Sequence, residues 1–262
     1  YELQQEPALN GDLPINLLGR SDDPDLVYFI REYESDDTAK LYSINLNTGQ
    51  LKEEFSRPDV NVFSLGNDPY TNMFMGVGWY DDVRRTAYLT DGLQNLTQQL
   101  QAAFPGSAVS VTSWDASYRK FVIRVSGGSV AQSYFLFDGG TGQLALIDNG
   151  YPEVPGEEVA PVEYFTYNAR DGLEIPAYLT LPLGKAASDL PLVVLPHGGP
   201  ESRDVPGFDF WPQMLANRGY AVLQPQFRGS DGFGQSFVKA GHREWGQKMQ
   251  TDLTDGVRNL VD

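Results

Sequence analysis

The stretch Leu190-Pro-Leu-Val-Val-Leu-Pro-His-Gly-Gly-Pro200 joins a short, continuous run of apolar residues to a turn that contains two glycines. An apolar run of this length is typical of a strand that is covered on both faces. Chemistry on an open α/β sheet usually lies at the carboxyl end of such a strand. Glycines there let backbone N–H groups approach a ligand, and such donors stabilise the charge of a tetrahedral acyl intermediate. The alternative is a plain Gly-Gly-Pro turn with a structural role.

The segments around this stretch alternate between strand and helix patterns after an initial strand pair. Alternation of this kind predicts an α/β layer with a largely parallel sheet over residues 155–262. Asp252 and Asp255 fall near the start of the last helix, at the positive end of its dipole. The expected strands are 162–167, 173–181, 190–195 and 220–223, with a turn at 169–172, and the expected helices are 210–218 and 249–261.

The first 154 residues follow a different pattern, because three stretches in them begin alike. Asp23, Asp68 and Asp115 mark the same place in each stretch, 45 and 47 residues apart. Each stretch begins with an Asx-type turn that leads into a strand, and a later strand ends in a hairpin turn, as at Asp91-Gly92. A repeat of about 45 residues with short strands and no helical periodicity is the size of a β-propeller blade. An antiparallel sandwich with coincidental spacing is the alternative.

The composition argues against several classes of function. Lys and Arg total 19 against 35 Asp and Glu, a formal charge of −16, so the basic footprint that nucleic acid or an anionic membrane requires is missing. The chain has no cysteine, which excludes disulfides, thiolate nucleophiles and zinc–thiolate sites. No apolar run approaches the roughly 18 residues of a membrane helix. We expect a soluble protein, and its compartment, cytoplasmic or periplasmic and exported, stays open.

Five motifs of the second half occur in a fixed order: His197-Gly-Gly-Pro, Arg218-Gly-Tyr-Ala-Val-Leu, Phe227-Arg-Gly-Ser-Asp-Gly-Phe-Gly, Trp245-Gly and Asp252-Leu-Thr-Asp-Gly. In this order they resemble the catalytic domain of the prolyl oligopeptidase family of serine peptidases, especially its acylaminoacyl-peptidase and dipeptidyl-peptidase-like branch. The three repeats fit the propeller that precedes this domain in the family. The implied fold is a partial β-propeller of about three blades, followed by the N-terminal half of an α/β-hydrolase domain. The implied boundaries are 1–154 for the propeller, with blades 15–59, 60–106 and 107–154, and 155–262 for the hydrolase part.

The resemblance also implies which catalytic parts are missing. The family's nucleophile elbow, Gly-x-Ser-x-Gly, would follow the helix that ends near Val261, and its aspartate and histidine come later still. We therefore expect an internal fragment that contains none of the Ser/Asp/His triad and is inactive alone. Ser129, in Gly127-Gly-Ser129-Val-Ala, is the nearest match to an elbow, but it falls between two strands, whereas an elbow joins a strand to a helix.

Carried over residue by residue, the resemblance assigns the oxyanion hole to the loop after the apolar strand. Gly199 is the first candidate for a backbone N–H donor and Gly198 is the next. His197 stands where sister branches have a tyrosine whose hydroxyl donates, so the role of its own side chain stays open.

A second loop is implied to support the pocket, with Arg228, Gly229 and Ser230 as its residues. Gln226 stands where the family usually has an asparagine, which leaves the contacts of its amide open. A solvated or structural role is expected for four other charged residues: Arg203, Asp204, Asp231 and Glu244.

The function implied by the resemblance is hydrolysis of short peptides through an acyl-serine intermediate, with the propeller restricting entry. No metal or organic cofactor is implied. The expected partners are a short peptide substrate and the missing C-terminal half of the same protein, and a homo-oligomer is left open. Two alternatives are a non-catalytic, propeller-based binding protein and an esterase of the α/β-hydrolase class. The sequence settles neither peptide specificity nor the choice between exopeptidase and endopeptidase action.

Overall fold

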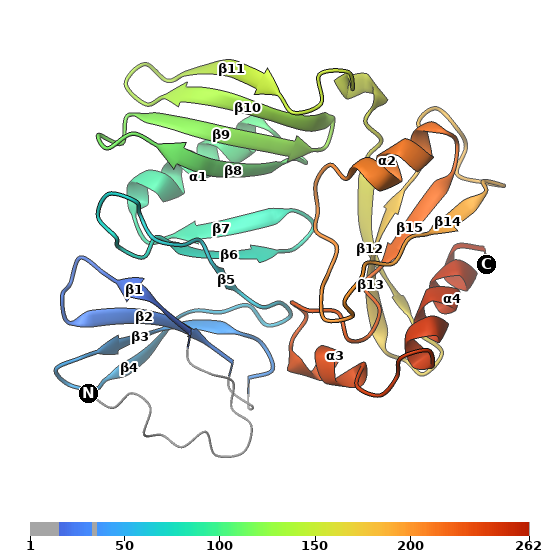
Figure 1. Ribbon diagram of the computed structural model, residues 1–262, viewed down its shortest axis with the longest axis horizontal. Coiled ribbons are helices and arrows are strands. Elements are labelled where there is room, and N and C mark those ends of the chain that lie inside the picture. Colours follow the sequence, from blue (N-terminus) through green and yellow to red (C-terminus); the bar gives the residue numbers. More distant parts are fainter. Residues whose placement is uncertain (1–15, 33–35, 262) are drawn as a thin grey trace.

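The structure, a computed structural model, describes residues 16–32 and 36–261. Three antiparallel sheets lie one beside the next, and a fourth sheet with helices on both sides lies next to them (Figure 1). Within the described residues, no helix has the length and apolar character needed to cross a membrane.

The three antiparallel sheets each fall inside one of the predicted repeats. Their strand orders are β1-β2-β3-β4, β5-β6-β7 and β11-β10-β9-β8, so neighbours in the chain are neighbours in each sheet. The strands are β1 Asn16–Arg20, β2 Leu26–Arg31, β3 Lys40–Asn45, β4 Leu51–Phe55, β5 Phe63–Ser64, β6 Gly76–Tyr80, β7 Arg84–Tyr88, β8 Ala108–Trp114, β9 Lys120–Gly127, β10 Val130–Asp138 and β11 Gln143–Asn149.

The aspartates that mark the repeats bond backbone N–H groups as the sequence predicted, although the third does so differently. Asp23 Oδ1 accepts from the N–H of Asp25 at 2.9 Å, and Asp68 Oδ1 accepts from that of Tyr70 at 2.9 Å. Both are Asx-type contacts with the residue two positions on. Asp115 Oδ1 instead accepts from N–H groups four and five residues further along.

The hairpin turn predicted at Asp91-Gly92 is wrong, because helix α1 (Asp91–Ala103) begins there. Leu93, Leu96 and Leu100 share one face of this helix and are buried in a cluster with residues of the third sheet. Their three- and four-residue spacing is a helical pattern. The repeat is therefore not free of helical periodicity, and tertiary burial of the leucines outweighs the local turn tendency of an Asp-Gly pair.

The fourth sheet has the order β12-β13-β15-β14 and is mixed. β12 and β13 form the predicted hairpin, and β13 pairs antiparallel with β15. Only β14 and β15 pair in parallel, so the expectation of a largely parallel sheet is wrong for the described strands. The remaining elements are η1 Gly156–Glu158, β12 Val162–Asn168, β13 Glu174–Thr180, β14 Leu192–Val194, α2 Phe210–Asn217, β15 Ala221–Pro225, α3 Gln235–Ala240 and α4 Lys248–Val261.

Helices α2 and α4 both contact β15 and lie on different sides of the sheet (Figure 1). Leu223 of β15 belongs to the buried cluster beside α4, which also contains Tyr167 and Ile175. The Tyr167 hydroxyl donates to the Asp252 carbonyl of α4 at 2.8 Å, and burial raises the pKa of this phenol. At Gly256 the helix comes so close that a Cβ would lie 2.8 Å from the Tyr167 ring.

We expect Gly256→Ala to destabilise the protein by roughly 1–3 kcal/mol, because the added methyl group overpacks the interface between α4 and the sheet. Alanine inside a helix otherwise stabilises relative to glycine by roughly 0.5–1 kcal/mol. Gly92→Ala in α1 is the matched control, since nothing lies within 4 Å of the added Cβ there. Urea unfolding of both variants measures the difference. A Gly256→Ala protein as stable as Gly92→Ala would contradict the close packing.

Candidate functional site

The two loops singled out in the sequence lie together at one edge of the fourth sheet. β14 and β15 are parallel, and the Leu195 N–H donates to the Leu223 carbonyl at 2.8 Å, so both strands end at this edge. The loop after β14 carries His197, and the loop after β15 carries Ser230. His197 Nε2 lies 2.8 Å from Ser230 Oγ, and the His197 ring stacks on Phe227 at 4.6 Å between centroids. The structure thus brings the two predicted groups of residues into contact.

Gly198 and Gly199 are exposed, and no acceptor among the described residues bonds the N–H of either one. Gly199 lines a cavity of about 300 Å³ together with His197, Pro200 and Phe227. Its φ of 130° is a conformation that favours glycine. A free N–H beside a cavity is what stabilisation of an oxyanion requires, so the geometry keeps Gly199 as the first candidate. Gly198 also has a free N–H but does not line this cavity.

The side chain of His197 does not offer a free donor to this cavity. Nδ1 lies 2.8 Å from the Gly198 carbonyl oxygen, and Nε2 faces the Ser230 hydroxyl. Burial lowers the pKa of the imidazole, which favours the neutral ring. Both ring nitrogens are therefore engaged within the two loops. The tyrosine hydroxyl of sister branches has no counterpart in this arrangement.

Arg228 is a buried cation held by two carboxylates. Its guanidinium donates to Asp252 Oδ1 at 2.8 Å and Oδ2 at 2.9 Å, and to both oxygens of Asp171 at 2.9 Å. Arg228 is 4% exposed and the Asp252 side chain is fully buried, whereas that of Asp171 is 33% exposed. The hydrogen bonds that Arg228 donates to Asp252 and Asp171 raise the pKa of Arg228, and the guanidinium lowers the pKa of Asp171. The predicted supporting residue thus ties its loop to α4 and to the β12–β13 turn.

Sequence reasoning missed the role of Asp252, which was attributed to the helix dipole. Asp252 follows Met249 by three residues and so lies on the buried face of α4. A carboxylate on an apolar helical face is a signal that a cationic partner lies opposite, because an unpaired charge is costly to bury. The partner itself, Arg228, could not be read from spacing alone.

The other members of the two loops have structural contacts. Gly229 donates its N–H to the Phe237 carbonyl of α3 at 2.9 Å. The buried amide of Gln226 accepts from the Asp204 N–H at 3.1 Å and donates to the Asp204 carbonyl at 2.8 Å. This amide therefore fixes the loop that continues from Pro200.

Arg203 and Asp204 follow Pro200 in the same loop and are both partly buried. The Arg203 guanidinium lies 4.2 Å from the centroid of the Phe233 ring and 5.2 Å from that of Tyr80 in β6, which places it between aromatic faces. Burial, together with the charge of Asp209, raises the pKa of Asp204 to about 6. A carboxyl group with this pKa is only partly ionised near pH 6.

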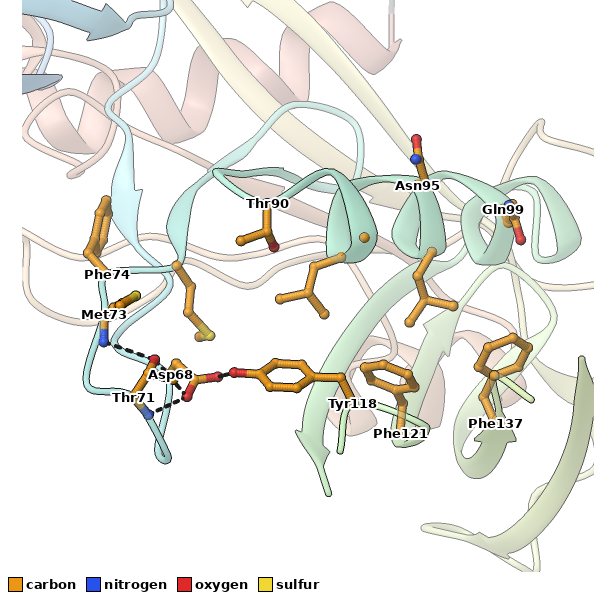
Figure 2. Close-up of a pocket in the computed structure, with 15 residues that line it drawn as sticks. Asp68, Thr71, Met73, Phe74, Thr90, Asn95, Gln99, Tyr118, Phe121 and Phe137 are labelled. Carbon is orange, nitrogen blue, oxygen red and sulfur yellow. Dashed lines mark hydrogen bonds between the residues drawn. The ribbon is translucent and has the colours of Figure 1, made fainter. Parts of the chain in front are cut away.

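Another cavity, of about 550 Å³, lies between α1 and the third sheet (Figure 2). Asp68 stands at its edge and accepts from the Tyr118 hydroxyl at 2.5 Å and from Trp114 Nε1 at 3.1 Å. Thr71 N–H donates to the other oxygen at 2.8 Å, and these bonds lower the pKa of Asp68 to about 2. Asp68 thus ties the second repeat to the third. The cavity is otherwise lined mainly by apolar side chains, such as Phe121 and Phe137.

Neither catalytic nor metal-binding clusters stand out elsewhere in the described part. Ser129 lies in the turn between β9 and β10, as predicted, and not at the start of a helix. Residues 16–32 and 36–261 hold no group of three His, Cys, Asp or Glu side chains arranged to bind a metal ion.

Comparison with known proteins agrees with the motifs. Residues 206–262 match the prolyl oligopeptidase family. The chain is 35% identical over 234 residues to dipeptidyl aminopeptidase BIII of Pseudoxanthomonas mexicana, covering 86% of this chain and 33% of that protein. It is 39% identical over 91 residues to the acylamino-acid-releasing enzyme of Sus scrofa, covering 34% of this chain and 12% of that enzyme.

Solved structures are similar in fold. A structure from a study of two prolyl endopeptidases superposes with a TM-score of 0.66 at 15% identity, covering 94% of this chain and 36% of that one. A puromycin-hydrolyzing peptidase of Mycobacterium tuberculosis superposes with a TM-score of 0.64 at 17% identity, covering 94% of this chain and 40% of that one. The chain belongs to the prolyl oligopeptidase family. It spans about a third of the length of dipeptidyl aminopeptidase BIII, which it matches over 86% of its own length.

We expect Asp252→Asn to lower the free energy of unfolding by about 3–5 kcal/mol, because it removes the buried charge that compensates Arg228. Asp171→Asn is the matched comparison at the same guanidinium, and its half-exposed position predicts a loss of roughly 1 kcal/mol. Denaturant unfolding of the two variants measures which of them loses more unfolding free energy. Equal losses would show that the two carboxylates contribute equally and would contradict the larger role of the buried one.

We expect the stability contributed by Asp204 to fall as the pH rises. The folded-state pKa of about 6 lies above the ordinary value of 3.8, so this contribution is fully present below pH 4 and is lost as the pH rises through 6. Relative to Asp204→Asn, the free energy of unfolding of the wild type should therefore fall by about 2 kcal/mol between pH 4 and pH 8. Urea titrations at several pH values measure it. A constant difference would contradict the raised pKa.

Proposed function

We propose that this chain is one part of a serine peptidase that hydrolyses short peptides through an acyl-serine intermediate. The chain would supply part of the oxyanion hole, with Gly199 and Gly198 as donors, and sheets that form part of a β-propeller restricting access. The observation that carries the proposal is the N–H of Gly199, which has no acceptor among the described residues and belongs to a residue that lines a cavity, on a loop that follows β14 in a chain of this family. The relatives are peptidases, and they favour neither a binding module nor an esterase.

The order of the fourth sheet supports the fold part of this proposal. Numbered along the chain, its strands lie in the order first, second, fourth, third. That order, with helices on both sides, fits the N-terminal half of an α/β-hydrolase domain. We propose the boundaries 1–154 and 155–262 for the two parts, with three blades in the first. In this arrangement the nucleophile would come from a further part of the protein, which is the partner we propose for this chain.

The described residues contain one serine–histidine contact, and it does not have the features of a nucleophile and its base. Ser230 Oγ is 2.8 Å from His197 Nε2, but the Ser230 side chain is fully buried and also bonds the Phe227 carbonyl at 2.6 Å. The other ring nitrogen of His197 faces the Gly198 carbonyl, where a triad base would meet a carboxylate. A nucleophile must reach its substrate, so we propose that Ser230 supports the loop and that this chain alone is inactive.

Labelling with a fluorophosphonate probe tests the assignment of the nucleophile. We expect no labelling of the isolated chain, and labelling of the full-length protein that is retained in its Ser230→Ala variant. A labelled isolated chain whose signal disappears in Ser230→Ala would make Ser230 the nucleophile. That labelling result would overturn the proposal that the attacking serine lies outside this chain.

Chromogenic substrates test the reaction class. The full-length protein should hydrolyse at least one of the acyl-alanyl, X-prolyl and aminoacyl derivatives, and the one preferred would identify the specificity. Hydrolysis of simple aryl esters without any peptide or amide substrate would instead place the protein among esterases. No hydrolysis at all, with no labelling, would favour a binding protein.

A further inference from the structure

We propose that the cavity between α1 and the third sheet binds a small hydrophobic amine, with its ammonium group beside Asp68 and its apolar part between α1 and the aromatic rings. The cavity has a volume of about 550 Å³. Ligand pockets commonly measure roughly 300–1,000 Å³ and have a mostly apolar lining with a few polar groups. The inference concerns the second and third repeats and does not depend on the proposed peptidase activity.

The cavity has apolar side chains on two opposite sides. Helix α1 lies on one side and contributes Leu93 and Leu96 to the lining. Phe121 and Phe137 of the third sheet lie across from the helix, and Tyr118 continues this aromatic side toward Asp68 (Figure 2). An apolar group placed between the two sides is removed from water, which is the main driving force for binding such a group.

Asp68 is the one charged residue among the described residues that line the cavity. Asp68 is buried, and within the described part of the chain no Lys or Arg forms an ion pair with it. Its hydrogen-bond donors are neutral: the N–H groups of Tyr70 and Thr71, the Thr71 hydroxyl, Trp114 Nε1 and the Tyr118 hydroxyl. Neutral donors favour the ionised carboxylate but leave its negative charge in place. A cation in the cavity is therefore attracted, and an anion is repelled.

The aromatic side of the cavity adds to this preference for a cation. The faces of Phe and Tyr rings are negative and attract an ammonium group within about 6 Å of the ring centroid. The Tyr118 ring is held in place at its hydroxyl, which donates to Asp68. Its backbone φ of 53° is uncommon for a bulky residue and persists only where the surroundings fix it. The ring is thus positioned before a ligand binds.

A small amine suits this lining better than a peptide does. Each oxygen of Asp68 already accepts at least two hydrogen bonds, so the carboxylate attracts a ligand through its charge. The amide groups of a buried peptide would lose their water without gaining partners on the apolar sides. Tyr118 is 41% exposed. An ammonium group beside this ring can therefore keep part of its water shell.

The cavity lies at the end of the third sheet that is farther from the fourth sheet. Near the other end of β9, Ser126 Oγ accepts from the Phe208 N–H at 3.1 Å, and Phe208 precedes α2. Phe121, which lines the cavity, comes five residues before Ser126 in β9, and five residues span roughly 16 Å along a strand. A ligand in the cavity therefore contacts the second and third repeats and leaves the loops after β14 and β15 untouched.

Isothermal titration calorimetry of the full-length protein with three ligands of one carbon skeleton tests the preference for a cation. Near neutral pH, 4-phenylbutylamine is a cation, 4-phenylbutan-1-ol is neutral and 4-phenylbutyrate is an anion. We expect the amine to bind at least about tenfold more tightly than the alcohol, because the aromatic rings and the carboxylate attract only the charged group. The anion should bind most weakly. Equal affinities for amine and alcohol, or tightest binding of the anion, would overturn the inference.

A variant that fills the cavity shows whether the amine binds there. Met73 lines the cavity from the second repeat, and Met73→Trp should weaken the binding of amine and alcohol by at least about tenfold, because less apolar surface of the ligand can be buried. Gln98→Trp is the matched control, since Gln98 is exposed on α1 and does not line the cavity. It should keep the wild-type dissociation constants. Unchanged binding of the amine to Met73→Trp would place it elsewhere and overturn the inference.

Asp68→Asn separates the charge of the site from its shape. The amine should bind about tenfold more weakly to this variant, and the dissociation constant of the alcohol should stay within about twofold. Thermal melting shows whether the fold is retained, because Asp68 joins two repeats. Where Asp68→Asn does not melt cooperatively, Tyr118→Leu takes its place and should again weaken the amine more than the alcohol. Equal losses for the two ligands in the folded variant would overturn the inference, whether or not the protein hydrolyses peptides.

Discussion

The ion pair between Arg228 and Asp252 joins the parts of the chain that the candidate site needs, and both groups are removed from water. Arg228 lies in the loop after β15 and Asp252 lies in α4, while Asp171 links the same guanidinium to the β12–β13 turn. A buried pair is costly to desolvate and is weak evidence for stability in itself. Its consequence is geometric, because a bidentate guanidinium tolerates few orientations of its partners. The loop that carries Ser230 is thereby fixed relative to the sheet and to α4.

The fixed loop after β15 in turn supports the loop after β14 through short contacts. Ser230 and Phe227 hold the His197 ring, and the amide of Gln226 bonds both backbone groups of Asp204. The two loops can meet because β14 and β15 are parallel and end at the same edge of the sheet. A hairpin would have placed the ends of two successive strands at opposite edges. The single parallel pair is therefore the feature of the sheet on which the site depends.

Much of this architecture could be predicted from local sequence patterns. Apolar runs, the turn at residues 169–172 and the helical face of residues 249–261 depend on neighbours in the chain, and the corresponding elements are present. The prediction failed where distant contacts decide the outcome. Asp91-Gly92 has the local chemistry of a turn, but burial of Leu93 against the third sheet makes it the start of a helix. The partners of Arg228 and of His197 Nε2 come from other segments, and no spacing rule identifies them.

The candidate site combines buried side chains that are hydrogen-bonded with exposed peptide N–H groups that are not. Arg228, Gln226 and Ser230 are buried, and each makes several hydrogen bonds, as buried polar groups must. The N–H groups of Gly198 and Gly199 have no acceptor among the described residues, and both glycines are exposed. A loop stabilised only by its own turn would be expected to use such donors internally, because backbone groups usually find partners. The Gly198 carbonyl lies 2.8 Å from His197 Nδ1, whereas the Gly199 N–H of the same peptide group has no acceptor among the described residues. Such an N–H can bind an anion beside the loop without first breaking another hydrogen bond, which is the condition for preorganised stabilisation of charge.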